Sequence, residues 1–219
     1  MLAFLTGDLF NLFVFFEVLL IASCCLMLHG GGKARLRAGT IYVVLNLVGS
    51  ALFLIAVGLL YGVAGTLNLA DLGRAMGALD SAGTGLARIG AVLLLVVFGL
   101  KAALVPLHLW LPEGYGEAAP VAALFAIMTK VGAYRILRVF TAVFGPLAGE
   151  LSWLAQPWLL PAALATLWLG MLGVLASRAL GELVAFLLIA SVGTLLTAFA
   201  LFSCPRSWPA STTSLTAPS

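Results

Sequence analysis

The stretch that decides the fold is Leu93-Leu-Leu-Val-Val-Phe-Gly-Leu-Lys101-Ala-Ala-Leu-Val-Pro106-Leu-His108. Its first half is apolar and belongs to a run that starts near Leu86, which is typical of a helix that crosses a membrane. The run then meets Lys101 and, shortly afterwards, Pro106, whose missing backbone N–H favours a bend or break in the helix. The stretch therefore predicts a membrane-spanning helix that is interrupted close to a buried lysine.

The composition excludes a soluble globular protein. Of the 219 residues, 63% are apolar and only 9% are charged, whereas soluble domains carry about 25% charged residues. At about 20 apolar residues for each crossing, the chain has room for about six or seven spans, with a short interfacial helix near 68–74. We predict about six spans, at residues 2–28, 40–61, 86–106, 120–140, 158–176 and 183–202. The expected protein is an all-α, multi-pass membrane bundle with one broken helix and no cleavable signal peptide.

Charges between the spans indicate the orientation. After His29, three glycines end the first helix, and Lys33, Arg35 and Arg37 hold the following loop in water. With about six spans, these three cations and Arg178 fall on the same side. Short loops rich in Lys and Arg face the cytoplasm, so we place the Lys33–Arg37 loop inside.

Three ionisable residues fall inside the predicted spans: Glu17, Lys101 and Lys130. A charge at a helix centre costs about 2.5–3.5 kcal/mol, so such residues mark a functional site by default and face the bundle interior or a wet cavity. A carboxylate that holds or releases a lysine is a natural gate, and two neighbouring lysines weaken each other's hold on a proton. The alternatives are a structural ion pair at Glu17 and a lysine at position 101 that reaches the interface from a helix end.

Other polar residues are candidates for accessory roles. His108 titrates near neutrality, and it is either a relay group or a cap for irregular backbone. Asp8, near the start of the first span, is either an accessory or a structural group. Glu113 and Glu117 fit solvated loop carboxylates as well as accessory sites.

The remaining polar groups in the spans are expected to be structural. Asn46 and Ser23 fit interhelical hydrogen-bond partners, and Arg135 and Arg138 lie where their side chains can reach water at a helix end. The sequence contains no phosphate loop, paired metal ligands or nucleophile constellation. We therefore predict no catalytic residue, metal, cofactor or nucleic-acid partner, and the net charge of +3 does not argue otherwise.

Three segments resemble a known family. They are Gly-Asp8-Leu-Phe-Asn-Leu-Phe-Val-Phe-Phe-Glu-Val, the stretch from Lys101 to Pro120 with its Pro-Leu-His-Leu-Trp-Leu-Pro core, and Ile-Met-Thr-Lys130-Val-Gly-Ala-Tyr. They are similar to the D subunits of Mrp-type (Mnh/Pha) monovalent cation/proton antiporters. The same fold and charges occur in the antiporter-like membrane subunits of respiratory NADH:quinone oxidoreductase. The sequence Asp8-Leu-Phe-Asn-Leu-Phe-Val is more similar to the antiporter subunit than to the respiratory one.

The resemblance covers about residues 3–203 and implies a role for each buried charge. Glu17 would be the gating glutamate, Lys101 the lysine of the broken helix, Lys130 the central lysine and His108 the relay histidine. The protein would lie in the lipid bilayer of the plasma (inner) membrane as one subunit of a hetero-oligomeric complex. That complex would exchange protons for Na⁺ or K⁺. The resemblance also supports the inside position of the basic loop.

The chain is expected to hold only part of the family's inverted-repeat fold. Identical Leu-Leu-Ile-Ala-Ser segments at 19–23 and 187–191 agree with two repeats, but family members have more than twice as many helices. Residues 1–203 are therefore predicted to be a partial proton-conducting, antiporter-like transmembrane domain.

Residues 204–219 are rich in Ser, Thr and Pro and do not resemble the family. By themselves they are typical of a disordered tail. However, codons for Ser207-Trp-Pro read two bases later give Leu, Met or Val followed by Ala, as in the family's next segment. We therefore hypothesise a shifted reading frame after about Ser203, which resequencing of the gene would test.

Three other functions stay open at this point. The chain would be a proton-pumping subunit of NADH:quinone oxidoreductase if it assembles with redox subunits, or a truncated fragment that does not transport. A small-solute carrier is disfavoured because the two lysines stand without another polar cluster shaped for a substrate.

Overall fold

The computed structural model describes residues 2–29, 32–108, 110–112, 122–146 and 148–202. Within these ranges every regular element is a helix, as the sequence predicts. The helices are α1 (Leu2–Leu5), α2 (Leu9–Leu28), α3 (Lys33–Ala64), α4 (Leu69–Met76), α5 (Ser81–Lys101), α7 (Ala122–Ala142), η2 (Gly149–Leu151), α8 (Gln156–Ala176) and α9 (Leu180–Phe202).

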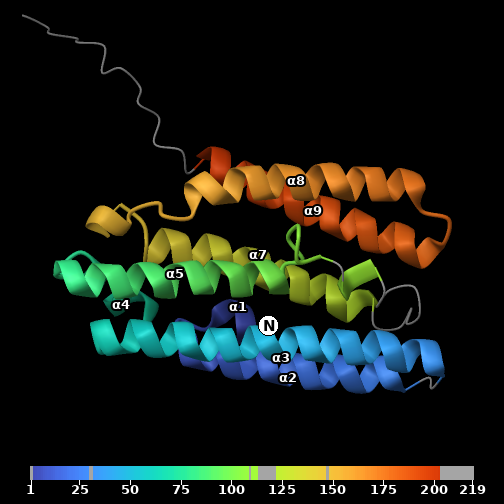
Figure 1. Cartoon of the computed structure of the whole chain (residues 1–219), viewed down its shortest axis with the longest axis horizontal. Helices are drawn as coiled ribbons and strands as arrows, with labels where there is room; N and C mark the ends of the chain where they lie inside the picture. Colours follow the sequence, from blue (N-terminus) through green and yellow to red (C-terminus); the bar gives the residue numbers. More distant parts are fainter. Residues whose placement is uncertain (1, 30–31, 109, 113–121, 147, 203–219) are drawn as a thin grey trace, which may run out of the picture.

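The long helices form three layers of two (Figure 1). The antiparallel pair α2 and α3 lies on one side, α8 and α9 lie on the other, and α5 and α7 form the middle layer. Contacts run from α3 to α5, from α5 to α7 and from α7 to α9. The middle layer therefore connects the two outer pairs, and it carries both of the lysines predicted to be functional.

Five of the described helical segments are long and apolar enough to cross a membrane. They are Leu9–Leu28, Arg35–Ala64, Ser81–Lys101, Gly149–Ala176 and Leu180–Phe202. The sixth long helix, α7, has 21 residues, about 31 Å at 1.5 Å per residue. Its cations, Lys130, Arg135 and Arg138, are spread along the middle and second half of the helix, whereas the cations of α3 are confined to its first turns.

The structure corrects the start of three predicted spans, and the third of them begins at Ser81 instead of near Leu86. The first predicted span divides at Asp8, whose side chain accepts hydrogen bonds from the N–H groups of Phe10 (2.8 Å) and Asn11 (2.9 Å) and so caps α2. The second begins at Lys33 instead of near residue 40, so the cations of the predicted loop lie in the first turns of α3. The short helix predicted near 68–74 is confirmed as α4.

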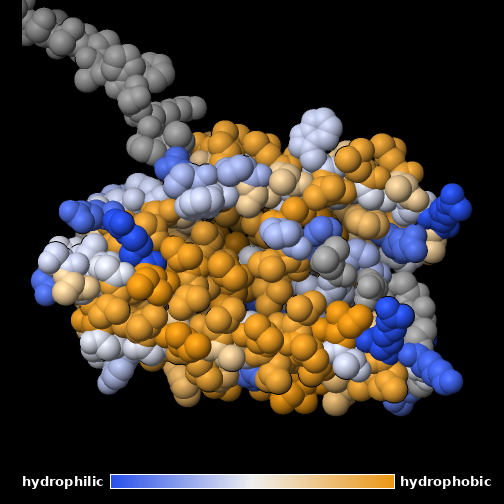
Figure 2. All heavy atoms as spheres, viewed as in Figure 1, coloured by the Kyte–Doolittle hydropathy of each residue, from blue (hydrophilic) through white to orange (hydrophobic). Residues whose placement is uncertain are grey.

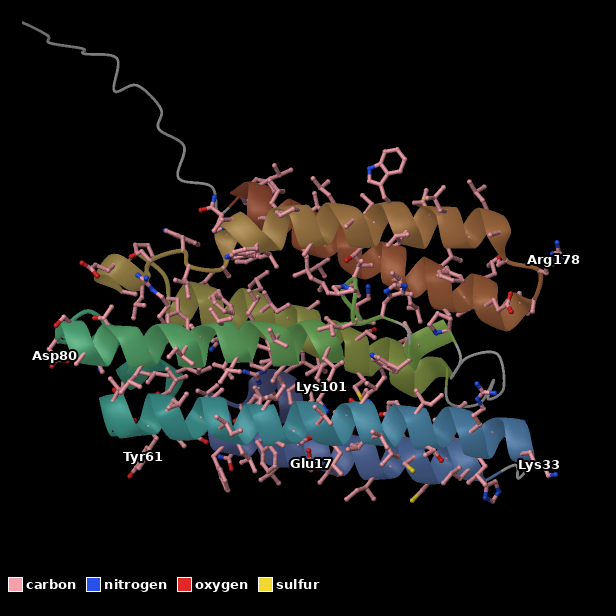
Figure 3. The ribbon with its side chains drawn as sticks, viewed as in Figure 1. Glu17, Lys33, Tyr61, Asp80, Lys101 and Arg178 are labelled. Atoms are coloured by element: carbon pink, nitrogen blue, oxygen red, sulfur yellow. The ribbon has the colours of Figure 1, made fainter. Side chains whose placement is uncertain are left out.

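Polar and apolar residues separate along the bundle. Figure 2 shows an apolar surface across the middle of the molecule, with hydrophilic side chains gathered at both ends. Lys33 and Arg178 lie at one end, and Asp80 and Tyr61 lie at the other (Figure 3). This arrangement agrees with the predicted placement of the basic loop and Arg178 on one side.

Arg135 differs from its predicted position at the water interface. Its side chain is fully buried and binds α1: Nε donates to the carbonyl of Ala3 (3.0 Å), as does Nη2, while Nη1 donates to the carbonyl of Thr6 (3.0 Å). The last carbonyls of a short helix lack intrahelical partners, and they lie within reach of this guanidinium. Arg138, one turn further on, is exposed as expected.

Candidate ion-translocation site

The site is built around the end of α5. The helix ends at Lys101, and Ala103 adopts a positive φ of 55°. The last carbonyls of the helix lack i+4 partners and accept other hydrogen bonds. The Gly99 carbonyl accepts from the Leu104 N–H (2.8 Å), and the Leu100 carbonyl accepts from the indole N–H of Trp110 (3.1 Å). The helix is therefore interrupted before Pro106, and the interruption is stabilised by hydrogen bonds.

A neighbouring helix also holds the interrupted segment. The N–H of Val105 donates to the Thr166 hydroxyl of α8 (3.1 Å). That hydroxyl in turn donates to the Ala162 carbonyl of its own helix (2.6 Å). The irregular backbone is thus paired with protein groups, which is how non-helical backbone is tolerated at membrane depth.

A glycine lets α7 approach this break closely. A Cβ atom at Gly132 would lie 2.6 Å from the backbone nitrogen of Ala102 and 2.8 Å from the carbonyl carbon of Lys101. No side chain fits at that separation, so glycine sets the distance between the two middle helices. Lys130, two residues earlier on α7, lies about 200° around the helix from Gly132 and so faces away from this contact.

Lys101 is almost completely buried, with 1% of its surface exposed. Its ammonium donates to the side-chain oxygen of Asn46 on α3 (3.1 Å) and lies 5.4 Å from the centre of the Phe16 ring on α2. An isolated charge in this apolar setting is costly. The amide oxygen and the aromatic face are the two groups that offset this cost directly.

Glu17 reaches the same face of α3 from α2. Its carboxylate accepts a hydrogen bond from the Ser50 hydroxyl, and Ser50 lies one turn beyond Asn46 on α3. Among the described residues the only ion pair is Arg74 with Asp71 at the surface, so Glu17 and Lys101 form no direct pair. Each charge instead contacts its own side chain on α3, Lys101 the Asn46 amide and Glu17 the Ser50 hydroxyl; Figure 3 labels the two charges.

The second lysine has a different partner. Lys130 is half-buried on α7 and donates a hydrogen bond to the Ser191 hydroxyl of α9. No hydrogen bond between Lys130 and Lys101 is found among the described residues. The structure thus brings Glu17 and Lys101 to α3 and directs Lys130 to the other outer pair.

The remaining predicted residues divide between those placed by the structure and those outside it. His108 is half-buried in the interrupted segment, and its Nδ1 is the buried side-chain polar atom without a hydrogen-bond partner among the described residues. Asp8 serves as the cap of α2. Glu113 and Glu117 lie outside the described residues, as does the tail 204–219.

Asn46 and Ser23 are interhelical hydrogen-bond partners, as predicted, but sequence reasoning missed Ser50 and Ser191. A signal for Ser50 was present: Tyr42, Asn46 and Ser50 recur at a spacing of four in an otherwise apolar span, which places them on one helix face. No group of three or more His, Cys, Asp or Glu side chains that could hold a metal ion occurs in the part of the chain that the structure describes.

The fold and the apolar helices define an all-helical, multi-pass membrane protein with ionisable side chains inside its bundle. The family described as "NADH:quinone oxidoreductase/Mrp antiporter, TM" matches residues 6–216. The chain belongs to this family, which confirms the resemblance seen in the sequence.

Individual relatives are named as the D subunits of antiporters. The chain is 50% identical over 200 residues to the probable K(+)/H(+) antiporter D subunit of Rhizobium meliloti (strain 1021), covering 91% of this chain and 37% of that protein. It is 47% identical over 196 residues to the Na(+)/H(+) antiporter D subunit of Bacillus subtilis (strain 168), covering 89% and 38%. The chain thus spans less than two-fifths of the length of these relatives.

The fold is similar to that of a chain in a solved complex. A chain in the structure of the Mrp complex from Dietzia sp. DQ12-45-1b superposes with a TM-score of 0.79 at 33% identity, covering 91% of this chain and 37% of that chain. The all-helical membrane fold and its place within a larger subunit fold are therefore confirmed.

Proposed function

We propose that this chain forms the proton-relay part of a cation/proton antiporter subunit, with Glu17, Lys101 and Lys130 as the charged groups. The observation that carries the proposal is Lys101, a nearly fully buried lysine at a helix break that is linked through α3 to a carboxylate. Intramembrane ionisable groups mark ion and proton pathways by default. A lysine kept only for structure would not need an interrupted helix beside it.

The chemistry of the relay follows from the contacts of Lys101. The protonated amine is held by the Asn46 oxygen and by the field of Glu17 across α3. When Glu17 is neutralised or moves away, the buried charge loses its compensation, and the proton leaves the Lys101 nitrogen. The proton is taken up by a neutral Lys130, and His108 in the interrupted segment after Lys101 is a second acceptor that the relay can use.

The partners follow from the relatives' names. The relatives at 50% and 47% identity are called subunits of K(+)/H(+) and Na(+)/H(+) antiporters, which supports Na⁺ or K⁺ as the exchanged cation. We propose that the chain works in the plasma membrane inside a hetero-oligomeric complex. Residues 1–203 would form its partial transmembrane domain.

The experiment uses the complex that contains this chain, purified through a tag on the chain and reconstituted into vesicles. Wild-type complex is expected to show proton flux that depends on Na⁺ or K⁺, whereas Lys130→Ala and Glu17→Gln reduce it to background. Arg138→Ala, an exposed cation on the same helix as Lys130, is the matched control and is expected to leave the flux unchanged. Unchanged flux in assembled Lys130→Ala complex would show that the relay is wrong.

The same preparation separates the two main rivals. Co-purification of flavin and iron–sulfur subunits would favour a proton pump of the NADH:quinone oxidoreductase type. Vesicles that contain this chain alone are expected to show no flux, because the chain spans 37% of the first relative's length. A complex without any cation-dependent flux would favour a fragment that does not transport.

A further inference from the structure

Three polar residues form a row along one face of α3: Tyr42, Asn46 and Ser50. They are four residues apart, so successive members rise by about 6 Å along the helix. All three are buried, with 0%, 0% and 5% of their surface exposed. We call this row the α3 ladder.

Each member of the α3 ladder has a partner on another helix. The Tyr42 hydroxyl hydrogen-bonds the Ser23 hydroxyl of α2 (2.6 Å) and the Met128 sulfur of α7 (3.4 Å). Asn46 accepts from Lys101 of α5, and Ser50 donates to Glu17 of α2. Two members of the ladder therefore hydrogen-bond the relay charges, and the hydrogen bonds given above for the Tyr42 hydroxyl reach Ser23 and Met128.

The orientation of Asn46 is fixed by a second hydrogen bond. Its amide nitrogen donates to the Tyr42 carbonyl of the preceding turn (2.9 Å). Because an ammonium has donors only, the amide oxygen must face Lys101, and this tether to the backbone keeps it there. Asn46 therefore presents an acceptor to Lys101 and resists turning its NH₂ group toward it.

Ser50 holds the other charge in a comparable way. Its hydroxyl is one turn from the Asn46 amide, and it gives the Glu17 carboxylate a donor within the bundle. Since no direct ion pair joins Glu17 to Lys101, the separation between the two charges is set by the spacing of Asn46 and Ser50 on α3.

We propose that Asn46 and Ser50 are positioning residues of the relay. From successive turns on one face of α3 they hold Lys101 of α5 and Glu17 of α2 at a fixed separation, so that the Glu17 carboxylate acts electrostatically on the Lys101 amine. This inference rests on the proposed function. It adds two uncharged residues that control how strongly the carboxylate acts on the amine. A merely structural pair would stabilise the bundle without affecting the rate at saturating cation.

The test measures the maximal rate and the half-saturating cation concentration of proton flux in the reconstituted complex. Asn46→Leu and Ser50→Ala are expected to lower the maximal rate at least about tenfold, equivalent to about 1.4 kcal/mol, with little change in half-saturation. Ser50→Thr, which keeps the hydroxyl, is expected to stay within about twofold of wild type. Tyr42→Phe removes a buried hydroxyl from the same face and is the matched control, also expected within about twofold.

The outcomes separate this inference from the function on which it rests. Wild-type complex without flux overturns both. Active wild type with equal losses in Ser50→Ala and Tyr42→Phe, or without rescue by Ser50→Thr, overturns the positioning role alone. Melting temperature and yield report assembly, and if Ser50→Ala does not assemble, Ser50→Cys, which has a similar size and a weak donor, is judged by the same thresholds.

Discussion

Lys130 of α7 donates a hydrogen bond to Ser191 of α9, so the second lysine of the middle layer is held by a different outer helix pair from the first. Lys101 is bound by α3, on the opposite side of the bundle. The two lysines thus lie on neighbouring helices and are stabilised from opposite directions. A change at one outer pair can therefore affect one lysine without directly displacing the partner of the other.

The Lys130 contact gives the first prediction. Ser191→Ala removes a hydrogen bond to a charged group, which contributes about 1.5–3 kcal/mol, and is expected to lower cation-dependent proton flux about tenfold. Thr194→Ala is the control, because Thr194 is exposed on α9 like Ser191, but its hydroxyl donates to the Ala190 carbonyl of its own helix (2.9 Å). Flux in vesicles checks the prediction, and equal effects of the two substitutions would contradict it.

Arg135 is predicted to matter for stability. Arg135→Leu removes the donors that reach the carbonyls of Ala3 and Thr6, and we expect it to lower the free energy of unfolding by about 3 kcal/mol. Thermal unfolding of the purified complex measures the effect, together with proteolysis of the segment that holds α1. Arg138→Leu is expected to change little, since that side chain is exposed and its contact with the Tyr134 hydroxyl is long (3.5 Å). A stable Arg135→Leu protein with α1 still protected would refute this prediction.

Gly132 is predicted to set the distance between α5 and α7. Gly132→Ala places a Cβ against the backbone of Ala102, and overpacking of this kind costs about 1–3 kcal/mol. We expect both melting temperature and flux to fall. Gly58→Ala is the matched control, because nothing lies within 4 Å of its Cβ position and alanine is the better helix former by about 1 kcal/mol. The prediction fails if both glycine substitutions raise stability.

Thr166 is predicted to hold the interrupted end of α5. Thr166→Val leaves the Val105 N–H without its acceptor, at a cost of about 1–3 kcal/mol. Hydrogen exchange of residues 102–108 is expected to become faster, with a fall in flux. Thr197→Val serves as the control, since the Thr197 hydroxyl donates only within α9, to the Gly193 carbonyl (2.8 Å). Unchanged exchange at 102–108 would show that α8 does not stabilise the break.

The long helices were predictable because their signal is local. Apolar runs of about 20 residues are read directly from the sequence, and the break near Lys101 follows from the nearby proline. Helix ends were less accurate: the cations of Lys33–Arg37 read as a loop, yet they form the first turns of α3. Charge alone does not end a helix that projects beyond the apolar layer into water.

The contacts of the site were less predictable because they depend on packing between distant segments. Arg135 lies near a helix end, which suggested a position at the water interface. Instead, the N-terminal helix α1 packs over it and supplies the carbonyl of Ala3. Asn46 and Ser50 were visible as a polar row on one helix face, but the sequence does not state which helices bring a carboxylate and an amine to that row.

The sequence by itself determined the class of protein, the positions of the apolar helices and the three ionisable residues inside them, because hydropathy and the cost of a buried charge depend only on residue type. The tertiary structure decided how these charges are partnered. It placed Lys101 of α5 and Glu17 of α2 against residues on successive turns of α3, and it turned Lys130 toward α9. Side-chain partners more than 30 positions apart are chosen by the way helices pack, and here Gly132 and the break after Lys101 control that packing.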